Sequence, residues 1–208
     1  MDLLLLADEN RKNEFLSAVS PTVFTTQWFD HLPVEENDLH ADLLVDLLFE
    51  NNPERINWLQ QTRIPCVMVN WMENNVPDQL IRINGWPGFT GRELLECACP
   101  DEQIRLQAER IAGQMGRTIE WTPSEIPFIS QSIVSGIINE AYLALQEDTA
   151  TQEGIDTAMK LGTNYPFGPF EWAERIGHKN IVHFLDYNLR ENTYGHVSIL
   201  LKEKALAQ

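Results

Sequence analysis

Short apolar runs alternate with helical segments from the start of the chain to about Thr122, and after Pro127 the pattern is helical throughout. Leu3–Leu6 is one such run, and its lack of polar alternation is typical of a strand buried on both faces. Alternating strands and helices predict a parallel sheet covered by helices, whereas unbroken helical periodicity predicts a bundle. We therefore expect an α/β domain over residues 1–122 and an all-α bundle over residues 123–208.

The first domain is predicted to contain both kinds of element. Its strands are expected over residues 3–6, 22–29, 41–49, 66–70, 80–84, 94–99 and 117–121. Its helices are expected over residues 8–19, 53–61 and 101–115. Gly116 is well suited to end the last helix, because glycine adopts the left-handed conformation at the residue after a helix.

The second domain is predicted to be entirely helical. Helices are expected over residues 129–145, 149–162, 169–176, 180–191 and 197–206. Thr149 and Gln152 match a capping box at the start of the second of these helices, and Gly162 marks its end. The first helix carries Ile129, Ile133, Ile137 and Leu145 on one i, i+4 row with Val134, Ile138 and Tyr142 beside it, so we expect it to be central to the domain.

Composition excludes several classes of partner. The chain has 15 Lys and Arg against 31 Asp and Glu, a formal net charge of −16, which argues against nucleic acid and anionic membrane surfaces. A hydrophobic content of 43% is enough for a packed core. The longest apolar runs, such as Leu3–Ala7, fall far short of the roughly 20 residues of a membrane helix, so we expect a soluble, cytoplasmic protein.

Cysteine and histidine do not predict a metal site. Cys66, Cys97 and Cys99 are expected to be buried, reduced thiols. The two weak groups of metal-ligating types are His178 with His183 and Asp186, and His31 with His40 and Asp42. Their spacing is not that of a known metal motif, so the default for each histidine is a satisfied or exposed side chain.

Two linked motifs near the C-terminus carry a family resemblance. Ile155–Gly162 followed by Tyr165–Glu171 resembles the C-terminal domain of 3-hydroxyacyl-CoA dehydrogenases, enzymes of fatty acid metabolism. Upstream, Ala41–Asp46 and Leu94–Glu96 resemble strands of the same family. The resemblance implies a Rossmann-like sheet domain, here truncated, and a helical domain through which two subunits form a homodimer. It also implies NAD-dependent oxidation of a 3-hydroxyacyl-CoA.

The resemblance assigns candidate site residues by position. The family uses a histidine held by a glutamate as its base, and Leu94–Glu96 aligns Glu96 with that glutamate. The histidine position, twelve residues earlier, is Asn84, which cannot exchange protons near neutral pH. The family's asparagine on the first helix of the second domain aligns with Gln131, and its serine falls near Met72.

The cofactor and coenzyme A features of the family are not found in this sequence. A G-x-G-x-x-G turn normally follows the first strand, because glycine lets the backbone approach a pyrophosphate at a helix N-terminus. Ala7–Arg11 stands there instead, and the first glycine of the chain is Gly85. Asp8 and Glu9 would meet a pyrophosphate with like charge, so no cofactor is expected unless the family activity, and with it NAD, is retained. Leu32–His40 is too short for the helical segment that helps the family hold coenzyme A.

Three functions remain open on these residues. The first is a diverged, non-catalytic member of the family. The second is an active NAD-dependent 3-hydroxyacyl-CoA or 3-hydroxybutyryl-CoA oxidoreductase that uses Glu96 with Asn84 and Gln131 in altered roles. The third is a module that binds a small molecule, an acyl-CoA or a protein partner in the interdomain cleft. Whether the protein is an enzyme is therefore not decided by its sequence.

Overall fold

The computed structural model describes residues 1–19, 24–33, 39–73, 76–124, 127–190 and 196–207. Two compact units, Met1–Ile126 and Pro127–Gln208, are called the N-terminal and C-terminal units below. Residues 34–38, which belong to the predicted replacement of the family's helical segment (Leu32–His40), lie outside the described residues. Within the described residues, no helix combines the length and hydropathy that a membrane crossing requires.

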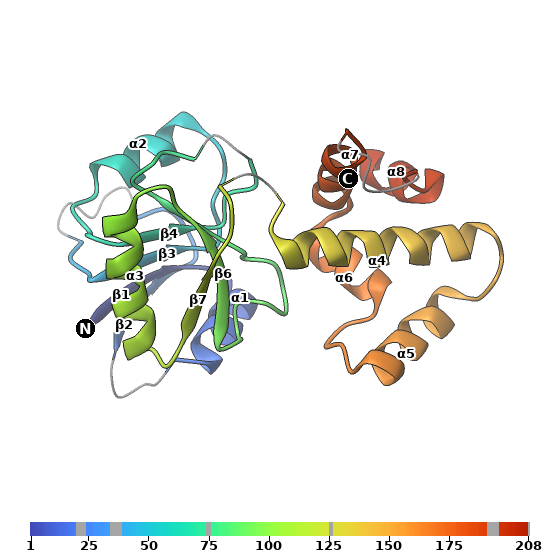
Figure 1. Cartoon of the computed structure of the whole chain (residues 1–208), viewed down its shortest axis with the longest axis horizontal. Helices are drawn as coiled ribbons and strands as arrows, with labels where there is room; N and C mark the ends of the chain where they lie inside the picture. The colour runs from blue at the N-terminus through green and yellow to red at the C-terminus, as the bar shows by residue number, and fades with distance from the viewer. Residues whose placement is uncertain (20–23, 34–38, 74–75, 125–126, 191–195, 208) are drawn as a thin grey trace. The chain divides into compact units, whose positions relative to one another are not determined.

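A seven-stranded sheet forms the centre of the N-terminal unit in the described part of the chain (Figure 1). Its strands, in chain order, are β1 (Asp2–Leu6), β2 (Thr25–Phe29), β3 (Leu43–Asp46), β4 (Val67–Val69), β5 (Ile81–Ile83), β6 (Leu94–Ala98) and β7 (Thr118–Trp121). Their order across the sheet is β2-β1-β3-β4-β5-β6-β7, and all neighbours are parallel except β5 and β6. The predicted fold, a largely parallel sheet followed by helices, is thus confirmed.

The antiparallel pairing of β5 with β6 departs from a purely parallel sheet. The residues between these strands, 84–93, form no helix. A parallel crossover of this kind needs a dozen or more residues, usually with a helix, so the chain instead turns back beside itself. The register places Arg82 opposite Ala98 and Ile83 opposite Cys97.

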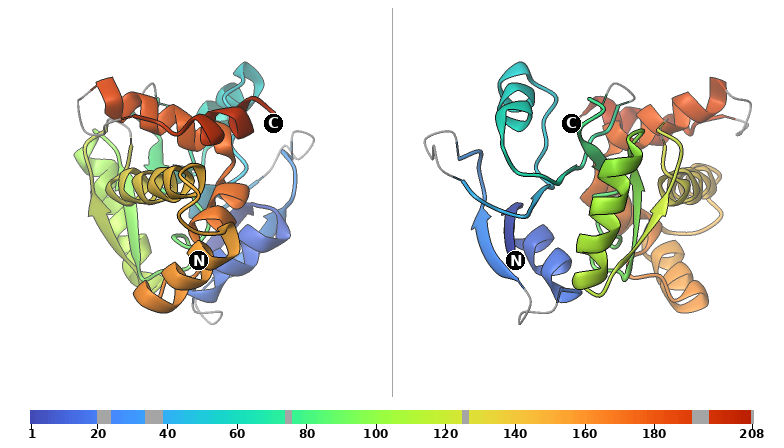
Figure 2. Two further views of the ribbon diagram at one scale, coloured as in Figure 1. Left: turned by 90° about the vertical axis from the view of Figure 1, so that its right-hand side faces the viewer. Right: turned by 60° about the vertical axis from the view of Figure 1, so that its left-hand side comes forward.

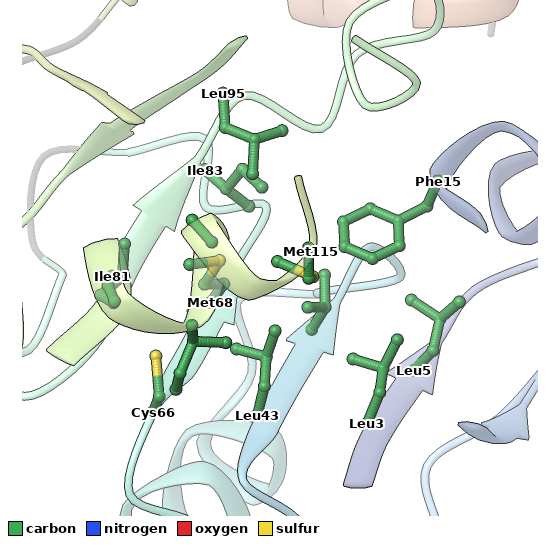
Figure 3. Close-up of a cluster of buried hydrophobic side chains, with 14 of the residues drawn as sticks. Leu3, Leu5, Phe15, Leu43, Cys66, Met68, Ile81, Ile83, Leu95 and Met115 are labelled. Carbon is green, nitrogen blue, oxygen red and sulfur yellow. The ribbon is translucent and has the colours of Figure 1, made fainter. Parts of the chain in front are cut away.

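Helices cover both faces of the sheet. Helices α1 (Glu9–Ser17) and α3 (Glu102–Gln114) lie on one face and α2 (Pro53–Gln61) lies on the other (Figure 2). The α1/α3 face holds the larger core, in which side chains from the strands meet Phe15 of α1 (Figure 3). Gly116 follows α3 with a φ of 77°, as predicted.

The cysteines belong to this core. Cys66, Cys97 and Cys99 are buried and free, which confirms the prediction. Burial raises the pKa of the Cys66 thiol to about 12 and raises that of Cys97 as well, so these thiols stay protonated and unreactive near neutral pH.

A carboxylate on α1 holds the connection between β5 and β6. Glu14 Oε1 accepts hydrogen bonds from the backbone N–H of Gly88 at 2.9 Å and of Thr90 at 3.0 Å, and from the Thr90 hydroxyl at 2.8 Å. The buried Arg117 donates to the carbonyl oxygens of Thr90 and Phe15. Desolvation by burial lowers the pKa of Arg117 to about 10. Helix α1, the connection and the start of β7 are therefore joined at one point.

The C-terminal unit consists of helices throughout its described residues. They are α4 (Ile129–Gln146), α5 (Gln152–Thr163), α6 (Pro169–Ile176), α7 (His178–Arg190) and α8 (Ile199–Leu206). Helix α4 contacts α6, α7 and α8, which confirms its predicted central place. The row that faces these helices is Val134, Ile138, Ala141 and Tyr142, whereas Ile129 and Ile133 of the neighbouring row are 57% and 53% exposed.

The predicted start and end of α5 were wrong. Thr149 does not cap α5. It belongs to the end of α4, where its N–H donates a hydrogen bond to the carbonyl oxygen of Ala144. The N-cap is Thr151, whose hydroxyl accepts from the N–H of Gly154 at 3.1 Å. The helix also passes the predicted stop at Gly162 and ends before Asn164, which takes the left-handed conformation with a φ of 56°.

The two C-terminal motifs meet at the N-terminus of α6. The buried Asp156 accepts hydrogen bonds from the N–H groups of Phe170 at 2.8 Å and of Glu171 at 3.3 Å. Glu171 in turn accepts from the N–H of Gly168 at 3.0 Å and from Lys160 at 2.6 Å. A Cβ at Gly168 would lie 2.3 Å from the Asp156 carboxylate, so only glycine fits there. The motifs therefore have a structural role in joining α5 to α6.

Replacing Gly168 with alanine should destabilise the C-terminal unit by about 2 kcal/mol, because the added methyl displaces the carboxylate that caps α6. Gly162→Ala is a matched control: nothing lies within 4 Å of the added Cβ, so it should stabilise the helix by up to ~1 kcal/mol. Chemical denaturation of both variants measures the two free energies of unfolding. Equal effects of the two substitutions would contradict this assignment.

Candidate functional site

Asn84 and Glu96 form a hydrogen-bonded pair at the end of the antiparallel β5–β6 ladder. The Asn84 N–H donates to the Glu96 carbonyl at 3.0 Å, and the Asn84 Nδ2 donates to the Glu96 Oε2 at 2.9 Å. The Oδ1 of the same amide accepts from the N–H of Trp86 at 3.2 Å. Asn84 is buried and Glu96 is half-buried. The structure thus brings together these two residues that the sequence singled out.

The chemistry of this pair is that of an orienting contact. A carboxamide neither takes up nor releases a proton near neutral pH, so Asn84 cannot act as general base or acid. Both ends of its amide are engaged, the nitrogen by Glu96 and the oxygen by the Trp86 N–H. The pair can hold the start of the β5–β6 connection in place, but it cannot relay a proton.

The first glycine of the chain serves this same region. The Gly85 N–H donates to the Asn70 Oδ1 at 3.1 Å, and a Cβ on Gly85 would lie 2.5 Å from the Asn70 Cγ. Asn70 directly follows β4, so the glycine lets the end of β5 approach the end of β4. Met72, near which the resemblance places the family's serine, is half-buried and carries no hydroxyl.

Gln131 belongs to the C-terminal unit and acts on its own helix. It is buried in the first turn of α4, where its Oε1 accepts from the Phe128 N–H at 3.1 Å. This bond satisfies one of the free donors at the start of the helix. The described contact of the Gln131 side-chain oxygen is therefore a cap.

The turn after β1 is where this fold usually holds a nucleotide phosphate, because the helix N-terminus faces the carboxyl edge of the sheet there. The Asp8 carboxylate occupies this helix N-terminus: its Oδ1 accepts from the Arg11 N–H at 2.9 Å and its Oδ2 from the Arg11 guanidinium. A pyrophosphate needs these amides and a glycine turn, so the residues present do not fit it.

An acidic residue also stands at the end of β2, where this fold holds a ribose hydroxyl about 20 residues beyond the glycine turn. It is Asp30, which forms a 2.7 Å hydrogen bond with the His31 Nδ1, and this bond lowers the pKa of Asp30. Asp30 was not predicted from the sequence, although an acidic residue directly after the second strand was a usable signal.

A buried ion pair closes the end of β3. Arg55 donates from Nε to the Asp46 Oδ2 at 2.8 Å and from a terminal nitrogen to the Oδ1 at 2.5 Å. The Leu48 N–H also donates to Asp46, at 3.1 Å. This pair was not predicted from the sequence either, because its partners are nine residues apart and meet only when α2 folds back on the sheet.

His178 and His183 have ordinary structural partners. In the C-terminal unit, the ring of buried His178 forms a 2.7 Å hydrogen bond with the buried Tyr142 hydroxyl, and the His183 ring packs against Phe184. Burial raises the pKa of Tyr142 to about 12. No cluster of three or more His, Cys, Asp or Glu suited to a metal ion occurs among the described residues.

Comparison with known proteins identifies relatives of both units. Residues 128–206 match the family model described as 3-hydroxyacyl-CoA dehydrogenase, C-terminal domain. The 3-hydroxyadipyl-CoA dehydrogenase of Escherichia coli is 37% identical over 112 residues, which are 52% of this chain and 23% of that protein. A probable 3-hydroxybutyryl-CoA dehydrogenase of Bacillus subtilis is 27% identical over 156 residues, which are 66% of this chain and 54% of that protein.

Among solved structures, the (S)-3-hydroxybutyryl-CoA dehydrogenase of Ralstonia eutropha superposes with a TM-score of 0.67 at 18% identity. The superposition covers 99% of this chain and 93% of that one, and at this identity it concerns the fold alone. The chain spans 23% and 54% of the lengths of the two curated relatives. What those proteins act on is therefore not carried over by similarity.

Because Tyr142 is buried, the stability of the C-terminal unit should fall as the pH rises through the alkaline range. Its pKa of about 12 in the folded state exceeds the ordinary value of 10.0, so between these values the unfolded chain ionises first and the C-terminal unit loses stability as pH rises. Tyr142→Phe should cost about 1 kcal/mol near pH 8 through its lost hydrogen bond, and this difference from wild type should shrink near pH 11. Denaturant unfolding at both pH values measures it. A difference that stays constant would contradict the assigned pKa.

Proposed function

We propose that this chain, which belongs to the 3-hydroxyacyl-CoA dehydrogenase family, keeps the architecture of that family but does not catalyse hydride transfer. The observation that carries the proposal is Asn84. The resemblance aligns it with the family's catalytic histidine, and its amide is held between Glu96 and the Trp86 N–H.

The reaction needs a group that this pair lacks. Oxidising a 3-hydroxyacyl group requires a base for the hydroxyl proton while hydride leaves for the cofactor. An amide at position 84 has no free electron pair of sufficient basicity at its nitrogen, and its oxygen already accepts a hydrogen bond from the Trp86 N–H. Glu96 retains the family residue, but its hydrogen-bonding partner is a carboxamide instead of an imidazole.

We also propose that the chain has no resident cofactor. The family is one of NAD-dependent dehydrogenases, and NAD would supply the hydride acceptor if it were bound. Asp8 fills the helix N-terminus that would hold the pyrophosphate, and Gly85, the first glycine, is used at the end of β5 against Asn70. A site of the family type for coenzyme A is likewise not expected, because only about nine residues, 32–40, stand where the family has its helical segment.

An assay of acetoacetyl-CoA reduction by NADH tests the proposal. The wild-type protein should not oxidise NADH above the buffer rate, and Asn84→His should remain inactive, because restoring the base does not restore a cofactor site. Glu96→Gln is the control and should behave as wild type does. Turnover in the wild type that Glu96→Gln abolishes would instead establish the active oxidoreductase with altered roles for Glu96, Asn84 and Gln131.

A homodimer formed through the C-terminal unit is a second proposal, and the exposed row of α4 supports it. Ile129 and Ile133 are 57% and 53% exposed, although isoleucine is usually buried. Ile133 also lines a surface hollow of about 530 Å³, whose other apolar lining residues are Ile137, Ala141, Ile155, Met159 and Pro169. A contiguous exposed apolar surface of this kind is typical of a protein interface. The family resemblance makes a second copy of the chain the expected partner.

Replacing Ile133 with aspartate should convert the dimer to a folded monomer, because it places a charge in the apolar contact. Leu206→Asp is the matched control: Leu206 is 86% exposed at the end of α8, in the same unit but outside the hollow, so its substitution should leave the dimer intact. Sedimentation velocity measures the mass of each. A monomeric wild type, or an Ile133→Asp dimer, would contradict the proposed interface.

A further inference from the structure

We infer that Asp8 is a built-in substitute for the phosphate group that this fold accepts at its first helix. The inference deepens the proposed function, since it rests on the chain having no resident dinucleotide. It adds that the chain itself supplies the anion at the N-terminus of α1, so that a side chain takes the place that a nucleotide phosphate would have there.

The contacts of Asp8 carry the inference. The first N–H groups of a helix have no partner within the helix, and their partial positive charge favours an anion. In α1 that anion is the Asp8 carboxylate, which accepts from the Arg11 N–H at 2.9 Å and also from the Arg11 guanidinium. An external phosphate would have to displace this carboxylate from the Arg11 N–H. It would also be repelled by the negative charges of Asp8 and Glu9.

Trp28 gives independent support from the neighbouring strand. Its indole N–H donates to the carbonyl oxygen of Ala7 at 2.7 Å, so the ring lies against the turn between β1 and α1. The Lys12 Nζ lies 3.6 Å from the centroid of that ring. The nearby ammonium group that could have neutralised a phosphate is thus engaged in a cation–π contact.

The end of β3 is closed in the same manner. Nucleotides in this fold bind at the point where the strand order reverses, which here lies between β1 and β3. Asp46, the last residue of β3, is satisfied by Arg55 and by the Leu48 N–H. Charged side chains on both sides of the reversal point therefore find their partners within the chain.

Amide hydrogen exchange on the full-length protein tests the inference. In Asp8→Ala the protection of the Arg11 amide should fall about fivefold, as expected when an N-cap is lost, and the melting temperature should drop by about 2–4 °C. Asp8→Asn should keep most of the Arg11 protection, because its amide oxygen still accepts the hydrogen bond. Glu9→Ala removes the same charge one residue away, where the side chain is exposed, and should leave Arg11 protected.

The outcomes separate this inference from the proposed function. Loss of Arg11 protection in Asp8→Ala, with Glu9→Ala unaffected, supports the substitution of a carboxylate for a phosphate. Unchanged exchange and melting in Asp8→Ala would overturn it, as would equal effects of Asp8→Ala and Glu9→Ala, which would reveal a general charge effect. Neither readout involves Asn84 or turnover. Unchanged exchange in Asp8→Ala together with an inactive wild type would therefore overturn this inference alone, whereas a wild type that oxidises NADH would overturn the proposed function as well.

Discussion

The antiparallel return of β5 into β6 is the constraint on which the N-terminal unit depends. The connection between these strands has no helix to stabilise it, so donors and acceptors from elsewhere must hold it. Glu14, from α1, accepts hydrogen bonds from the N–H groups of Gly88 and Thr90. Arg117, just before β7, donates to the carbonyl oxygen of Thr90. With the connection held in this way, the register sets residue 84 against residue 96, and the chemistry of the site follows from which side chains occupy those two positions.

The strand and helix pattern was largely predictable, because it depends on local periodicity. Alternating buried runs predict the parallel sheet, and Gly116 ends α3 as its conformational freedom suggests. The limits of α5 were not predictable from the same rules. Thr149 and Thr151 are both plausible caps, and the choice depends on how α4 ends, where the Thr149 N–H is taken by the Ala144 carbonyl.

The candidate site was predictable only where a family pattern supplied the spacing. The twelve-residue interval between Asn84 and Glu96 is matched by a direct hydrogen bond in the structure. Contacts that cross the fold gave no local signal: the Gly88 N–H bond to Glu14 spans 74 residues, and the inward row of α4 is set by three packed helices. The cap of α1 is, in contrast, a local contact, because Asp8 accepts from the N–H of Arg11 three residues further on.

Calorimetric titration of the purified protein with NADH, after any bound nucleotide has been removed, tests this account most directly. Because the Asp8 carboxylate caps the helix N-terminus at which this fold would hold a pyrophosphate, the account predicts no saturable heat of binding up to millimolar NADH. Binding of one NADH per chain with micromolar affinity, about −8 kcal/mol, would contradict it. Such a result would mean that the edge of the sheet opens for a dinucleotide despite the contacts that close it.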